Sequence, residues 1–84
     1  MKKSLHTLQQ KKLQKLLREI RAESRLSQTD LAGRLGKPQS FVSKYETGER
    51  LLDIIELRQV CFAIGLSLQD FIRQLENVIN ETES

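Results

Sequence analysis

With 84 residues, of which 14 are Lys or Arg and 11 are Asp or Glu, this chain can build only one small core, so we expect one domain. Its one cysteine excludes an internal disulfide, and the absence of a long apolar run argues against a membrane span or a signal peptide. We therefore expect a cytoplasmic protein. Residues 1–50 hold 12 of the basic and five of the acidic residues, and this basic half favours a polyanionic partner.

The N-terminal part predicts a flexible basic arm over residues 1–6, followed by a helix over about residues 7–24. The apolar residues of this helix recur at helical spacing and form one face: Leu13, Leu16, Leu17 and Ile20. Its basic residues lie mainly outside that face: Lys11, Lys12, Lys15 and Arg18.

Residues 27–50 (SQTDLAGRLGKPQSFVSKYETGER) predict two short helices, at 28–35 and 39–47, joined by a tight turn. Ser27 and Asp30 have the spacing of a capping box. Gly36 suits a left-handed helix end, and Pro38 suits the start of the next helix. Any helical corner with a solvated face can show some of these features. Their occurrence together, with a small residue where two steeply crossing helices meet, favours a helix-turn-helix.

A fourth helix is predicted over residues 53–64, where Asp53 and Glu56 have the spacing of a second capping box. It is apolar around much of its circumference, as in a central packing helix, through Ile54, Ile55, Leu57, Val60, Cys61 and Ile64. We interpret Cys61 as a buried apolar residue rather than a nucleophile.

A fifth helix is predicted over residues 68–80, with residues 81–84 as a tail. Its apolar residues form one stripe: Leu68, Phe71, Ile72, Leu75, Val78 and Ile79. A small chain cannot easily cover both edges of such a stripe. We therefore predict a homodimer interface that contains Ile72, Leu75 and Ile79. The alternative is that the whole stripe belongs to the core of one chain.

These features resemble the Cro and lambdoid-repressor type of helix-turn-helix proteins, the XRE family. The residues that carry the resemblance are Leu26-Ser27-Gln28, Leu31-Ala32, Gly36, Gln39-Ser40, Val42-Ser43, Tyr45-Glu46-x-Gly48, Leu57 and Gly65-Leu66-Ser67. The resemblance implies an all-α, compact five-helix bundle whose second and third helices form the helix-turn-helix. It also implies a transcriptional regulator, expected to be a repressor, that binds a palindromic operator as a dimer. Lys37 and Glu49 depart from the usual pattern.

The second helix of the motif is expected to enter the major groove of double-stranded DNA, where amide, hydroxyl and amine groups can read base edges. We predict base contacts from Gln39, Ser40 and Lys44. The predicted phosphate contacts are Gln28, Ser43, Thr47, Arg50, Lys2 and Lys3. By the resemblance, Gln28 also braces Gln39. For each of these polar residues alone, plain solvation is the alternative.

The resemblance further implies a buried ion pair between Arg21 and Glu46, which would tie the first helix to the third. The alternative is that both are surface charges of little energetic consequence. The sequence contains no catalytic combination of Ser, His and an acid, no P-loop and no glycine-rich nucleotide turn, so we expect no enzyme activity and no cofactor. The only histidine, His6, has no Cys or carboxylate cluster around it in the sequence, so a metal site is not expected. An antitoxin that binds a partner toxin as well as DNA is the alternative function.

Overall fold

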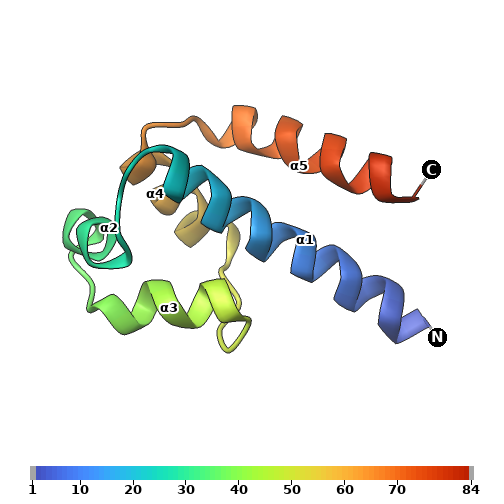
Figure 1. The fold of residues 1–84 in the computed structure, drawn as a ribbon, viewed down its shortest axis with the longest axis horizontal. Coiled ribbons are helices and arrows are strands. Elements are labelled where there is room, and N and C mark those ends of the chain that lie inside the picture. Colours follow the sequence, from blue (N-terminus) through green and yellow to red (C-terminus); the bar gives the residue numbers. More distant parts are fainter. Residues whose placement is uncertain (1, 84) are drawn as a thin grey trace.

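Five helices follow one another in the computed structural model, which describes the backbone of residues 2–83 and the side chains of residues 8–81 (Figure 1). They are α1 (Lys2–Glu23), α2 (Gln28–Leu35), α3 (Gln39–Thr47), α4 (Ile54–Ile64) and α5 (Leu68–Glu83). The described part of the chain contains no strand. The all-α, five-helix architecture is therefore the one that the sequence predicts.

Local signals in the sequence set the ends of the two central helices. Ser27 Oγ accepts a hydrogen bond from the Asp30 N–H at 2.9 Å, and Asp30 Oδ2 accepts from the Ser27 N–H at 3.0 Å. Gly36 ends α2 with φ of 67°, in the left-handed region that glycine tolerates best. Pro38 lies at the N-cap of α3, one residue before the helix proper. The turn between α2 and α3 is thus fixed by residues that have little conformational choice.

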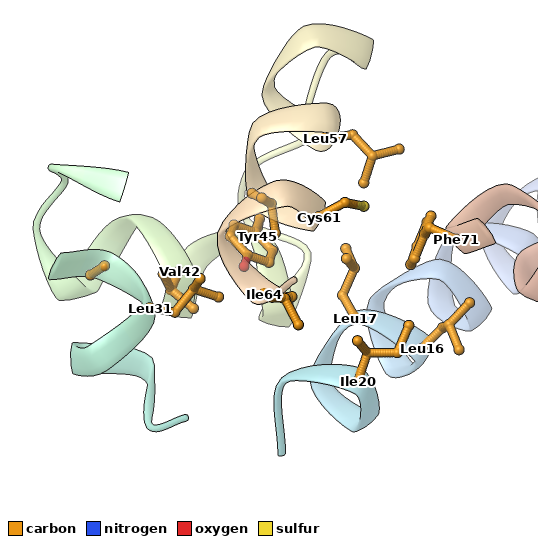
Figure 2. Close-up of a cluster of buried hydrophobic side chains, with 12 residues drawn as sticks. Leu16, Leu17, Ile20, Leu31, Val42, Tyr45, Leu57, Cys61, Ile64 and Phe71 are labelled. Carbon is orange, nitrogen blue, oxygen red and sulfur yellow. The ribbon is translucent and has the colours of Figure 1, made fainter. Parts of the chain in front are cut away.

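All five helices contribute to the core. α2 and α3 contact each other extensively, and α1 contacts both α3 and α5 (Figure 1). Figure 2 shows the buried side chains converging between the helices. The buried apolar residues are Leu16, Leu17, Ile20, Leu31, Ala32, Val42, Tyr45, Leu57, Val60, Cys61, Ile64 and Phe71.

Two helices are longer than predicted. α1 begins at Lys2 instead of about residue 7, so the backbone of residues 2–6 is helical rather than an arm. Those residues contain no Gly or Pro, and extending an existing helix requires no new nucleation. The side chains of Lys2 and Lys3 lie outside the described residues. α5 continues to Glu83, three residues beyond the predicted end.

The expectation that α4 is a central packing helix is wrong, because apolar residues at both of its ends are exposed. Ile54 and Ile55 are 58% and 60% exposed, and Phe62 is 82% exposed. The buried residues of α4 are Leu57, Val60, Cys61 and Ile64, which recur at the spacing of a single stripe. α4 therefore packs as a surface helix does, with one apolar face inward.

Candidate nucleic-acid interface

The predicted base-reading side chains lie together on the outer face of α3. Gln39 is the first residue of the helix, Ser40 follows it, and Lys44 lies one turn further on; all three are exposed. Ser43 is half-buried, and Thr47 is exposed with its hydroxyl donating to the Lys44 carbonyl at 3.3 Å. An exposed polar face at the start of α3 has the form that major-groove readout requires.

The Gln39 side chain is oriented by a hydrogen bond to Gln28 at the start of α2. Gln39 Nε2 donates to Gln28 Oε1 at 2.6 Å, and Gln28 Nε2 donates to Glu46 Oε1 at 2.9 Å. The two amides thus form a relay from the end of α3 back to its beginning. The relay ends on a carboxylate that is itself fixed.

That carboxylate belongs to Glu46, which is only 1% exposed. Arg21 binds it through two hydrogen bonds, from Nε to Oε2 at 2.7 Å and from Nη2 to Oε1 at 3.1 Å. Arg21 Nη1 also donates to the Leu26 carbonyl at 2.7 Å. The hydrogen bonds to Glu46 raise the pKa of Arg21 above its usual value. The structure therefore contains the ion pair that the sequence resemblance implies, and this pair anchors the relay to α1.

A second arginine of α1 was not singled out in the sequence. Arg18 Nη1 donates to the backbone carbonyl of Glu46 at 2.9 Å. This carbonyl lies in the last turn of α3, where carbonyls lack intrahelical partners. Nothing in the residue spacing predicts this bond, because it depends on how α1 crosses α3.

Arg50, a predicted phosphate contact, is already engaged within the chain. Its guanidinium binds Glu56 through Nη1 at 3.1 Å and Nη2 at 2.8 Å, and it lies 4.8 Å from the centre of the Phe41 ring. The hydrogen bonds from Arg50, followed by the Asp53 N–H, lower the pKa of Glu56 to about 2. The ammonium of Lys37 also lies near this ring, 5.5 Å from its centre. Any phosphate bound by Arg50 would compete with Glu56.

The three predicted dimer residues on α5 are all half-buried in the single chain. Ile72 and Leu75 pack against the chain's own core. Ile79 is half-buried near the C-terminal end of the helix. Among the described residues, the large apolar side chains that are exposed lie elsewhere, at Leu8, at Leu51 and on α4. The dimer contact through α5 stays a prediction.

Other chemistry is limited in the part of the chain that the structure describes. Cys61 is fully buried, and burial raises the pKa of its thiol to about 11. Among the described residues, no group of three or more His, Cys, Asp or Glu could hold a metal ion. None of the described helices is both long and apolar enough to cross a bilayer.

Comparisons with known proteins agree with this geometry. A family model described as Helix-turn-helix matches residues 17–71. A solved structure, described as an XRE-family like protein from Pseudomonas syringae pv. tomato str. DC3000, is 42% identical to the chain with a TM-score of 0.84. The match covers 90% of this chain and 93% of that one. None of the curated proteins that were compared matches the sequence. This chain therefore belongs to the XRE-type helix-turn-helix family of DNA-binding transcriptional regulators.

Proposed function

We propose that this protein is a repressor that binds a palindromic operator with α3 in the major groove. The observation that carries the proposal is the relay that presents Gln39. The side chain is exposed at the N-terminal end of α3, and it is held in place through Gln28 by the buried Glu46. A preoriented side chain loses less conformational entropy on binding than a free one.

The relay leaves Gln39 the atoms that it needs to read a base. A glutamine amide has two N–H donors and one carbonyl acceptor. Gln28 takes one N–H, so the second N–H and the carbonyl remain. Together they match the N7 acceptor and the N6 donor that adenine shows in the major groove. Ser40 and Lys44 lie beside this position on the exposed face and complete the proposed base-reading set.

Phosphate contacts would position α3 without reading sequence. Gln28 is the first residue of α2, where free backbone N–H groups favour an anion. Ser43, Thr47 and Arg50 are further proposed contacts along α3 and the loop after it. Residues 1–50 have a net charge of +7, which suits a polyanion.

Selection from a pool of random duplexes tests the proposal directly. The full chain should enrich one motif with inverted symmetry, and its affinity should fall steeply with salt. For about 6–10 phosphate contacts the loss is about 10³–10⁵-fold between about 50 and 200 mM salt. A pool that enriches no motif at any salt concentration would exclude sequence-specific binding.

Dimerisation through Ile72, Leu75 and Ile79 would place two copies of α3 on half-sites about 34–36 Å apart. Replacing both Ile72 and Ile79 by glutamate should give a folded monomer by sedimentation and circular dichroism, with operator affinity lost. Because Ile72 packs on the chain's own core, the single variant Ile79→Glu is needed beside the double variant. If Ile79→Glu is folded and still dimeric, the interface lies elsewhere.

A protein partner, such as a toxin bound by its antitoxin, is a second candidate function. The observation that favours it is the large apolar side chain of Phe62 on α4, which is 82% exposed. Co-expression with the product of the adjacent gene tests it. A complex that forms with the wild-type chain but not with Phe62→Ser would support such a partner.

A further inference from the structure

A groove between α1 and the end of α3 has no role in the function proposed so far. We call it the α1–α3 groove; its volume is about 650 Å³. The residues that line it are Leu8, Lys11, Lys12, Gln14, Lys15, Arg18, Glu46 and Thr47. The basic residues recur along one side of α1, so the groove has a wall of four cations. The sequence shows these charges but not the groove, which exists only because α3 ends against this side of α1.

Few negative charges oppose these cations. The carboxylate of Glu46 is bound by Arg21 and Gln28, and it is the backbone carbonyl of Glu46 that accepts from Arg18. Lys15 lies 3.9 Å from Glu19, but both side chains are more than half exposed, so the pair is weak. Neither Lys11 nor Lys12 forms an ion pair with a described side chain. The α1–α3 groove therefore attracts anions.

The groove has a fixed position relative to the base-reading face. Gly48, which ends α3 with φ of 91°, lies so close to Gln14 that an added Cβ would be 2.9 Å from Gln14 Nε2. Arg18 adds its hydrogen bond to the same end of α3. Figure 1 shows that α1 continues beyond this point, past the C-terminal end of α3. These contacts place the basic side of α1 at the end of α3 that is opposite Gln39.

This placement fits the geometry of a helix in the major groove. A helix of nine residues is about 13.5 Å long, and the major groove is about 12 Å wide. With α3 inclined across the groove and Gln39 at the bases, the other end of α3 lies near a sugar–phosphate strand. From Lys11 to Arg18 the side of α1 extends about 10 Å, which corresponds to about three phosphates of one strand.

We propose that the α1–α3 groove binds the phosphate backbone of the duplex that flanks the base-reading site. Lys11, Lys12, Lys15 and Arg18 are the contacts, and they act on every sequence alike. The inference rests on the proposed function for the position of α3. Its own effect is independent of sequence, so it is measurable on random duplex as well as on operator.

The test compares two charge-matched double variants of the full chain. Lys11→Gln with Lys12→Gln removes two positive charges from the groove, and Arg58→Gln with Arg73→Gln removes two from α4 and α5. Glutamine keeps a high helix propensity. Binding is measured against salt concentration by fluorescence anisotropy. The probes are random and operator duplexes, each in a short form and in a form extended by about six base pairs on each side. Circular dichroism checks the fold of each variant.

The slope of log K against log salt is negative. In the extended duplexes, the groove variant should make this slope less steep by about 2, because each lost phosphate contact removes about 0.9 from its magnitude. The control variant should leave the slope unchanged. The wild type should gain affinity from the added flanks, and the groove variant should lose most of that gain. An unchanged slope in the groove variant, or an equal loss on short and extended duplexes, would overturn the inference. The first of these results is also expected if the groove holds an acidic protein segment instead. Absence of operator preference in the wild type would instead overturn the proposed function.

Discussion

Replacing Arg21 by alanine removes three hydrogen bonds that hold α1 to α3 and to the turn before α2. Two of them reach the carboxylate of Glu46, and the third reaches the Leu26 carbonyl. Glu46 keeps the bond from Gln28 but has no counter-charge left, although its side chain is only 1% exposed. The variant therefore contains a buried carboxylate that is solvated by one amide.

Breaking a buried ion pair on one side typically costs about 3–5 kcal/mol of folding free energy. The Arg21 side chain is 16% exposed, so water can enter where the guanidinium was, and we expect the lower end, about 3 kcal/mol. The matched control is Lys15→Ala in the same helix. Its pair with Glu19 is exposed and long, so its loss should cost only about 0.3–0.5 kcal/mol.

Urea unfolding followed by circular dichroism measures both changes. At a slope of about 1–3 kcal/mol per molar urea, a loss of 3 kcal/mol moves the midpoint by at least about 1 M. Adding Glu46→Gln to Arg21→Ala should recover part of the loss, because the buried charge is then removed. Equal midpoints for Arg21→Ala and Lys15→Ala would refute the reasoning. A further fall on adding Glu46→Gln would refute it as well.

Three further substitutions test other parts of the structure. Gln39→Ala should cost about 1–3 kcal/mol at one base pair of the operator and relax specificity there, as measured by competition with single-base variants. The Tyr45 hydroxyl is buried with no hydrogen-bond partner among the described residues. Tyr45→Phe should therefore leave the urea midpoint unchanged or raise it, and a clear fall would reveal a partner. The hydrogen bonds from Arg50, followed by that from the Asp53 N–H, lower the pKa of Glu56 from 4.5 to about 2. The ionised Glu56 therefore contributes fully to stability above about pH 4.5, and this contribution is lost as the pH falls through 2. Midpoints measured across this range should fall less for Glu56→Gln than for the wild type.

The helix ends of the motif could be predicted because their signals are local. Ser27 and Asp30 satisfy each other's backbone within four residues, and Gly36 has the conformation that only glycine adopts readily. Burial of α4 could not be predicted in the same way. Ile54 and Ile55 are as apolar as the buried residues that follow, and only the neighbouring helices decide which face is covered.

In the candidate interface, too, some features follow from local sequence and others only from how distant helices pack. The sequence could predict which side chains of α3 are exposed, because the inward residues of that helix are known. These exposed side chains are Gln39, Ser40 and Lys44. The bond from Arg18 to the end of α3, and the close approach of Gln14 to Gly48, depend on how two distant helices cross. Glu56 is another such case, because the path of the loop after α3 brings it to Arg50 and occupies the guanidinium. Residue spacing contains no information on these crossings.

The buried thiol of Cys61 is a built-in probe of how often the core opens. Thiolate is the reactive form, and a pKa of about 11 together with complete burial makes the folded state nearly inert to labelling reagents. Labelling therefore proceeds only through molecules whose core has opened, and because Cys61 is the only cysteine, each modification reports one such event. The labelling rate measures the free energy of opening without any introduced probe. Tyr45 of α3 packs in the same core as Cys61 (Figure 2). A bound duplex that restrains α3 should therefore also lower the rate at which Cys61 is labelled.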